Sequence, residues 1–138
     1  MSFREKTAWI ALAAILIAAS IYFGTLVAHR GDPSHAFAVG LFLKVVLLQT
    51  VITAAATIVA AIASPADARA PRDERDHMVA ALAAGRAYYP LLIGVAVTSA
   101  TIHFGATAFD LLNGMLAMIM LAEAWRFATQ IVLYRRGA

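Results

Sequence analysis

Hydrophobic residues in this chain fall into four long runs, and the polar and charged residues are gathered in short segments between them. The runs cover residues 7–28, 36–63, 78–104 and 106–134. A helix needs about 20 residues to cross a hydrocarbon core about 30 Å thick, and every run reaches that length. The first run exceeds the roughly 7–15 apolar residues of a signal peptide, so we expect it to be retained as a span. The pattern predicts an all-α integral membrane protein, a four-transmembrane-helix bundle that forms one domain over residues 1–138.

The placement of charge predicts the orientation of this bundle. The 138 residues are 62% hydrophobic and only 14% charged, which is typical of a membrane protein. Seven basic residues outside the runs would share one side of the membrane: Arg4, Lys6, Arg69, Arg72, Arg75, Arg135 and Arg136. Only Arg30 would lie on the other side, so the positive-inside rule predicts that both termini are cytoplasmic. The formal charge is +3. We interpret these basic residues as determinants of topology that contact anionic lipid headgroups, and we expect no nucleic-acid partner.

The two halves of the chain share a short internal similarity. Residues 20–24 (SIYFG) and 101–105 (TIHFG) are related by an offset of 81, and the same offset relates Gln49 to Gln130. This spacing favours a parallel two-hairpin repeat, in which two helix pairs have the same orientation. Chance similarity is the alternative interpretation, because the matching segment is short.

The third helix is expected to begin before the membrane. Pro71 suits a first helical turn. The acidic residues that complement the positive end of this helix dipole are Asp73, Glu74 and Asp76. Pro90 lies inside the span and cannot donate a hydrogen bond to the carbonyl of Arg86, so we expect a bend there.

Three segments carry a resemblance to a known group of proteins. They are the opening residues 1–9, the loop 65–76 and the closing residues 121–137. Through these segments the chain resembles a family of small four-span proteobacterial inner-membrane proteins. The resemblance implies the same topology and a location in the bacterial inner membrane, and it carries no activity, substrate or catalytic residue.

Charged residues inside the runs define a first candidate site. Ionised groups in hydrocarbon cost roughly 2.5–3.5 kcal/mol each on insertion scales, so they persist when they are paired, wetted or close to an interface. Arg86, Glu123 and Thr53 fall at a similar depth in the inner leaflet. The predicted polar network consists of Arg86, Glu123, Arg126, Thr53, Thr57 and Gln130. One hypothesis makes it a gate for an ion or anion, and the alternative makes it a clamp that fixes which helices pair.

Aromatic residues are expected near the same inner interface. The members of this predicted aromatic belt are Trp9, Tyr88, Tyr89, Trp125 and Tyr134. We interpret them as interfacial anchors and not as a cofactor site.

A second candidate site lies toward the outer leaflet. The predicted outer pocket consists of Lys44, His103, Asp110, Asn113 and Tyr22. Lys44 and Asp110 would neutralise each other, and His103 would make the mouth of the pocket sensitive to pH. In the alternative interpretation Lys44 extends toward the headgroups and the histidines are ordinary interfacial residues.

The sequence holds no diagnostic metal motif, and we expect no bound metal or cofactor. The chain has no cysteine, which excludes thiolate ligands, disulfides and cysteine redox pairs. The nearest approach to a metal-binding set is His29, His35 and His103 with Asp32 or Asp110. The spacing of these residues is not that of a metal site.

Small residues favour contact between two copies of the chain. The face of the fourth run opposite its charged residues carries Gly114, Ala117, Ala124 and Ala128. Such a smooth face allows close helix packing. If the charged face points into its own bundle, the small residues are free to form a homodimer.

The function classes follow from these features. The sequence contains no nucleophile elbow, His-Glu-x-x-His motif, phosphate-binding glycine loop or pair of catalytic carboxylates, so we expect a non-enzymatic protein. The favoured interpretation is a binding, sensing or assembly protein in the lipid bilayer. The charged segment from Arg69 to His77 would then dock a cytoplasmic protein partner, and the alternative interpretation makes it the solvated start of a helix. The alternatives are a small ion or solute transporter or channel that acts as a homo-oligomer, and a periplasm-facing metal-binding membrane protein.

Overall fold

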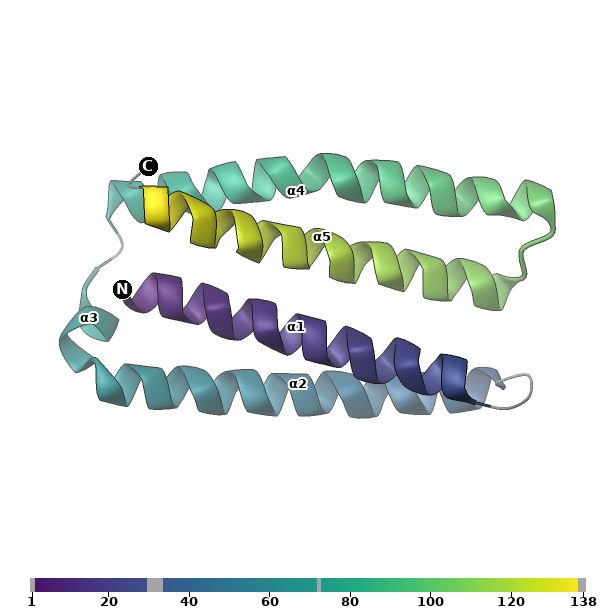
Figure 1. Ribbon diagram of the computed structural model, residues 1–138, viewed down its shortest axis with the longest axis horizontal. Helices are drawn as coiled ribbons and strands as arrows, with labels where there is room; N and C mark the ends of the chain where they lie inside the picture. Colours follow the sequence, from purple (N-terminus) through teal and green to yellow (C-terminus); the bar gives the residue numbers. More distant parts are fainter. Residues whose placement is uncertain (1, 30–33, 72, 137–138) are drawn as a thin grey trace. The chain divides into compact units, whose positions relative to one another are not determined.

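The computed structural model describes residues 2–29, 34–71 and 73–136, and these residues form helices joined by short connections (Figure 1). The helices are α1 (Phe3–Ala28), α2 (His35–Ala63), α3 (Pro65–Arg69), α4 (Glu74–Ala100), the 3-10 helix η1 (Thr101–Phe104) and α5 (Ala108–Arg136). Within the described residues α1, α2, α4 extended by η1, and α5 are long and apolar enough to cross a membrane. The all-helical class and the four long helices are thus confirmed. Arg30, Asp32 and Arg72 lie outside the described residues.

The chain divides into two compact units, the first ending at Ala70 and the second beginning at Pro71. The first unit contains α1, α2 and α3, and the second contains α4, η1 and α5. Each unit is built around one pair of long helices. A single four-helix domain stays a prediction.

In the first unit, α1 and α2 run side by side in opposite directions (Figure 1). A small cavity of about 30 Å³ lies between them, lined by Ala14, Ile17, Ala18, Ile21, Val45, Leu48, Gln49 and Ile52. The small side chains of Ala14 and Ala18 are buried and let the two helices approach closely. Lys6 Nζ donates a hydrogen bond to Ser64 Oγ at 2.7 Å, which ties the start of α1 to the end of α2.

The start of α4 differs from the expectation. Asp73 Oδ1 accepts a hydrogen bond from the backbone N–H of Asp76 at 2.7 Å, and α4 begins at Glu74. The prediction that Pro71 lies in the first turn is therefore wrong. The aspartate carboxylate satisfies a backbone N–H that has no partner within the helix, which fixes the helix start after Asp73.

In the second unit, α4 and α5 pack through small residues. Ala83, Ala87, Gly94 and Thr98 are buried along one face of α4. A Cβ atom added at Gly94 would lie 2.6 Å from Met118 Sδ, and one added at Gly114 would lie 2.7 Å from Thr98 Cγ2. These distances leave no room for a methyl group at either glycine.

Gly114 therefore packs within its own unit. The sequence assigns this glycine to a face that would be free for a second copy of the chain, and at Gly114 that prediction is wrong. The methyl group of Thr98 on α4 occupies the space in front of Gly114. A residue without a side chain serves here to bring the two helices of one hairpin together.

The two similar segments, 20–24 and 101–105, differ in conformation. The first belongs to α1, which continues as an α-helix to Ala28. The second forms η1 and ends at Gly105, whose φ of 85° lies in the left-handed region that favours glycine. Similar residues thus form an α-helix in one case and a 3-10 turn with a glycine cap in the other. The parallel repeat stays a prediction.

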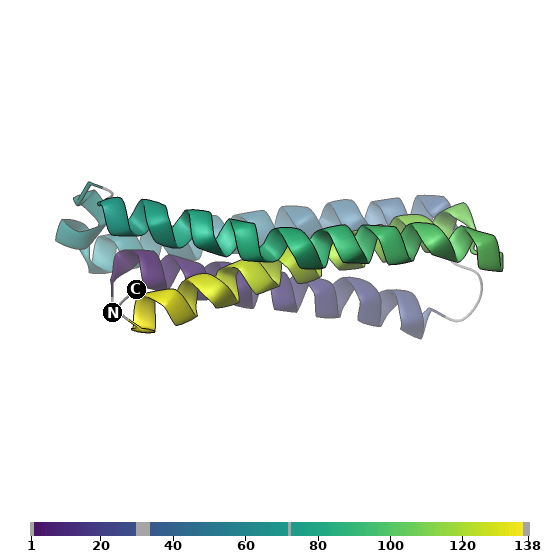
Figure 2. The ribbon, with the colours of Figure 1, turned by 90° about the horizontal axis from the view of Figure 1, so that it is seen from above.

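The α4 helix continues through Pro90. Figure 2 shows α4 as one continuous ribbon, in keeping with its range of Glu74–Ala100. Because proline has no backbone N–H, the carbonyl of Arg86 lacks the donor that an α-helix normally supplies four residues later. This carbonyl can accept a hydrogen bond from another group.

Candidate functional site

Glu123 and Arg126 form an ion pair along α5. Arg126 Nε and one of its terminal nitrogens donate to Glu123 Oε2 at 3.0 and 2.5 Å. The Arg126 guanidinium also lies 4.4 Å from the centroid of the Phe127 ring, within reach of a cation–π interaction. This pairing of the predicted network is present, and it is made within one helix.

The other members of the predicted network lie on three helices. Thr53 and Thr57 belong to α2 in the first unit, whereas Arg86 belongs to α4 and Gln130 to α5 in the second. The Thr53 hydroxyl is buried and has no hydrogen-bond partner among the described residues. Within the described part of the chain no ion pair joins Arg86 to Glu123, whose carboxylate is bound by Arg126.

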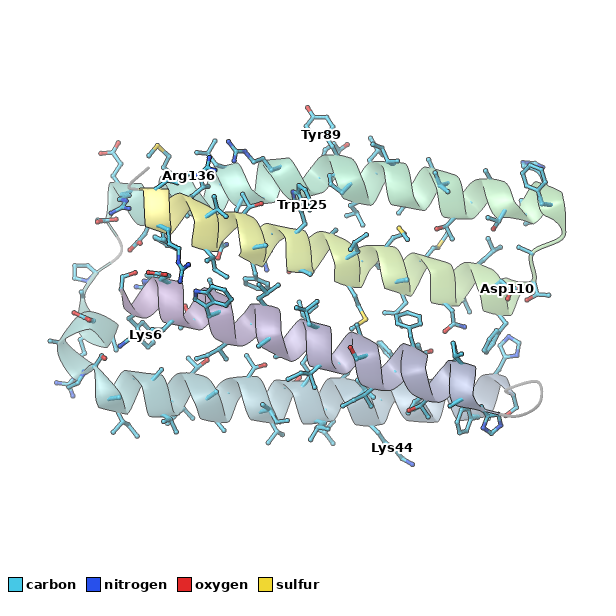
Figure 3. The ribbon with its side chains drawn as sticks, in the orientation of Figure 1. Lys6, Lys44, Tyr89, Asp110, Trp125 and Arg136 are labelled. Carbon is cyan, nitrogen blue, oxygen red and sulfur yellow. The ribbon has the colours of Figure 1, made fainter. Side chains whose placement is uncertain are left out.

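Arg86 lies in an open groove on the second unit, which we call the Arg86 groove. It encloses about 910 Å³, and its lining includes Leu82, Gly85, Arg86, Tyr89, Pro90 and Trp125. The side chains of Tyr88, Tyr89 and Trp125 are 57%, 66% and 54% exposed, respectively. Figure 3 shows Tyr89 pointing away from α5. The groove therefore offers a guanidinium beside aromatic side chains that carry hydrogen-bond donors.

The sequence singled out Arg86 and the aromatic residues of this groove, but it did not show that they lie together. It assigned Arg86 to the polar network and Tyr88, Tyr89 and Trp125 to the aromatic belt. The close spacing of Arg86, Tyr89 and Pro90, within about one helical turn, was the available signal. The contribution of Trp125 depends on how α5 packs against α4.

Asp110, a member of the predicted outer pocket, caps the start of α5. Its Oδ2 accepts hydrogen bonds from the backbone N–H and the hydroxyl of Thr107, at 2.9 and 2.7 Å. The backbone N–H of Asp110 in turn donates to Thr107 Oγ1 at 3.2 Å. This reciprocal pattern is that of a capping box, so the carboxylate stabilises the first turn of its own helix.

The remaining outer-pocket residues are divided between the two units. Tyr22 and Lys44 belong to the first unit, and the Tyr22 ring packs edge-on against Phe42 at 6.2 Å between centroids. Lys44 is exposed on α2 and points away from α1 (Figure 3). In the second unit Asn113 Nδ2 donates to the carbonyl of Phe109 at 2.8 Å, and His103 is exposed in η1.

The three histidines considered as metal ligands lie at or near the ends of helices. The His29 ring stacks on Phe37 at 4.3 Å between centroids, and His35 is the first residue of α2. Across residues 2–29, 34–71 and 73–136, no three His, Cys, Asp or Glu side chains cluster as a metal site requires. Asp32, named above as a candidate ligand, falls outside these residues.

Contacts that the sequence did not reveal join the start of α4 to the end of α5. The Tyr134 hydroxyl donates to Asp76 Oδ1 at 3.0 Å, and an Arg75 guanidinium nitrogen donates to the carbonyl of Tyr134 at 3.2 Å. Part of the charged segment 69–77 thus has partners inside the second unit. The position of a tyrosine at the end of the fourth run and an acid at the start of the third was the signal for this contact.

Comparisons of this chain with protein-family models, with curated proteins and with solved structures give no match. The family resemblance of the sequence stays a prediction. Function is therefore inferred from the residues of the two helical units.

Proposed function

We propose that this chain is a non-enzymatic, multi-pass protein of the bacterial inner membrane that binds a ligand through the Arg86 groove, with both of its termini in the cytoplasm. The four long apolar helices and the asymmetry of basic residues support the membrane location and the orientation. The observation that carries the binding function is the exposed Arg86 in an open groove of aromatic side chains.

An exposed arginine in an apolar helix needs an anionic or polar partner. Transfer of an arginine side chain to the centre of a bilayer costs roughly 2.5–3.5 kcal/mol on insertion scales. Arg126 meets this need with Glu123 in its own helix. Arg86 lies in a groove large enough for a small molecule to supply the anion.

The acidic residues of the second unit support binding over catalysis. Asp73 and Asp110 cap helices, Asp76 accepts a hydrogen bond from Tyr134, and Glu123 is paired with Arg126. A carboxylate that is held by such contacts has a structural partner and is not free to act on a substrate. The groove itself contains no carboxylate among its lining residues.

Native mass spectrometry of the protein released from membranes in mild detergent tests the binding function. We expect the wild type and Glu123→Gln to retain an added small-molecule mass, and Arg86→Gln to lose it. Glu123→Gln is the matched control because it changes another charged group within the long helices of this unit, one that does not line the groove. A wild type that carries no added mass, or an Arg86→Gln variant that keeps it, would contradict the proposal.

Cysteine labelling tests the membrane location and orientation, since the chain has no cysteine of its own. The variants Ser2→Cys, Ala70→Cys and Arg136→Cys should react with a membrane-impermeant maleimide from the cytoplasmic side only. The variants His29→Cys and Phe104→Cys should react from the opposite side only. The reverse pattern, or reaction of all five from both sides, would overturn the topology.

Lys44 supports a second candidate function, transport through a homo-oligomer. It is an exposed ammonium group on the apolar surface of α2, where Leu43 and Leu47 are also exposed. If copies of the chain assembled along α2, Lys44 would face the space between the copies, where water or an ion could replace lipid around its ammonium group. Flux of small anions into liposomes that Lys44→Met abolishes would favour transport, and equal flux with and without the protein would exclude it.

A cytoplasmic protein partner at residues 69–77 is a further part of the proposal. Arg69 and His77 are exposed at the two ends of this segment. Crosslinking from cysteine at either position should capture the partner in cells, and capture of lipid or the chain itself alone would argue against it.

A further inference from the structure

The Arg86 groove combines a basic group, aromatic donors and apolar side chains. Arg86 supplies the charge, Tyr89 supplies a hydroxyl, and Leu82 and Ile93 supply apolar surface. The carbonyl of Arg86 is left without its helical donor by Pro90, so the groove also offers an acceptor. An occupant that matches this set has an anionic group, a hydrogen-bond donor and an apolar part.

The depth of Arg86 along α4 restricts the occupant further. Eighteen residues separate Arg86 from Phe104 at the far end of η1, which corresponds to about 27 Å of helix. This length is close to the thickness of a hydrocarbon core, about 30 Å. If Phe104 lies at one interface, Arg86 lies at the opposite one, at the level of the lipid phosphates. Tyr88, Tyr89 and Trp125 are of the types enriched at that level.

We propose that the Arg86 groove binds the headgroup of an anionic phospholipid. The guanidinium holds the phosphate through paired N–H···O bonds, and the carbonyl of Arg86 accepts a hydrogen bond from a headgroup hydroxyl. One acyl chain lies along Leu82 and Ile93. This inference rests on the proposed membrane-bound binding function and names the ligand class of the same groove.

The open space at Gly85 provides a way to block the groove without changing its charge. A Cβ atom added at Gly85 would meet no heavy atom within 4 Å, so a larger side chain enters empty space. Gly85→Leu should therefore exclude the lipid sterically and leave the packing of α4 on α5 unchanged. Arg86→Gln removes the charge and keeps the space.

Fluorescence quenching by brominated lipids measures the occupant of the groove directly. The chain has two tryptophans, so Trp9→Phe leaves Trp125, a lining residue, as the only tryptophan. This background protein is inserted into phosphatidylcholine vesicles that contain a minor fraction of phosphatidylglycerol. Either lipid is brominated in turn, and flotation first establishes that the protein is inserted.

We expect phosphatidylglycerol to be enriched about fivefold over phosphatidylcholine at Trp125, the ratio typical of one basic residue near an anionic lipid. Arg86→Gln and Gly85→Leu should each bring the ratio close to one. Arg136→Gln, a change of an exposed arginine at the end of α5 and away from the groove, should leave the ratio unchanged.

Three results would overturn the inference. They are equal quenching by the two lipids in the parent protein, an enrichment that survives Arg86→Gln or Gly85→Leu, and an enrichment that inorganic phosphate abolishes. The last result would identify soluble phosphate as the ligand. Failure of the protein to insert into vesicles would contradict the proposed function itself, whereas insertion without enrichment contradicts only the choice of ligand.

Discussion

Gly114→Ala adds one methyl group at a place where α4 and α5 are in close contact. The new Cβ would lie 2.7 Å from Thr98 Cγ2, well inside the optimal separation of two carbon atoms, about 3.5–4.0 Å. Thr98 is β-branched and has few rotamers available in a helix. The clash is therefore relieved mainly by moving the two backbones apart, which loosens the packing around Gly94 and Met118 as well.

The expected change in the free energy of unfolding has two opposing terms. Overpacking typically costs about 1–3 kcal/mol, and alanine is favoured over glycine inside a helix by about 0.8–1.0 kcal/mol. Gly114→Ala should therefore destabilise the protein by up to about 2 kcal/mol. Gly85→Ala is the matched control, because its Cβ meets nothing within 4 Å and only the favourable helix term acts. The difference between the two variants, about 1–3 kcal/mol, isolates the overpacking term.

Unfolding in mixed micelles with increasing dodecyl sulfate, followed by helical circular dichroism, gives these free energies. Thr98→Ser provides a second and stricter measurement, because it deletes the Cγ2 atom that the new methyl group would meet. In the double variant the clash is absent, and the double-mutant cycle should show a coupling of about 1–3 kcal/mol. Equal stabilities of Gly114→Ala and Gly85→Ala, with no coupling to Thr98→Ser, would refute the close approach of α4 and α5.

Three further predictions follow from the hydrogen bonds, and the same unfolding measurement checks each. Asp110→Ala removes the hydrogen bonds to Thr107 and should lower the stability of α5; an unchanged stability would mean that the cap contributes nothing. Tyr134→Phe deletes the hydrogen bond to Asp76 and should cost about 0.5–1.5 kcal/mol, with Tyr88→Phe as the exposed control expected to cost nothing. Thr53→Val replaces a buried hydroxyl that has no partner among the described residues, so stability should stay equal or rise; a loss above about 1 kcal/mol would instead support the polar network.

The helices were predictable because the limits of an apolar run are set by simple physics. The run 36–63 and α2 (His35–Ala63) differ by one residue at the start. Helix α1 begins at Phe3, before the first run, because Ser2 accepts a hydrogen bond from the backbone N–H of Glu5 at 3.2 Å. Hydropathy locates the part of a helix that avoids water, and capping residues determine where the helix itself starts.

The packing of the helices was not predictable in the same way. A helix that is apolar on all sides has no amphipathic face to indicate its neighbour. The sequence therefore assigns Gly114 to a face for a second copy of the chain, although the residue packs against α4. Which partner Gly114 packs against depends on shape, because the methyl group of Thr98 fits against this glycine. The periodicity of the sequence carries no information about that fit.

The candidate site also has a part that could be predicted from the sequence and a part that could not. The Glu123–Arg126 pair could be predicted, because residues three apart on a helix are neighbours whatever the helix packs against. The Arg86 groove could not, because Trp125 reaches it from another helix. Contacts within one helix follow from spacing, whereas a site built by two helices needs their relative rotation.

Arg86 and Arg126 lie well inside the two long helices of the second unit. They meet the cost of their charge in different ways, and the difference indicates which one has a function. Arg126 has Glu123 three residues before it, so its charge is balanced wherever α5 is placed. Arg86 has Leu82, Ala83, Tyr89 and Pro90 at the corresponding positions of α4, and none of these can neutralise it. A charge that is balanced within its helix places few demands on its surroundings, whereas one that is not balanced depends on water or on an external anion for its stabilisation. Arg86 is for this reason the residue at which a bound anion would do most to stabilise the second unit.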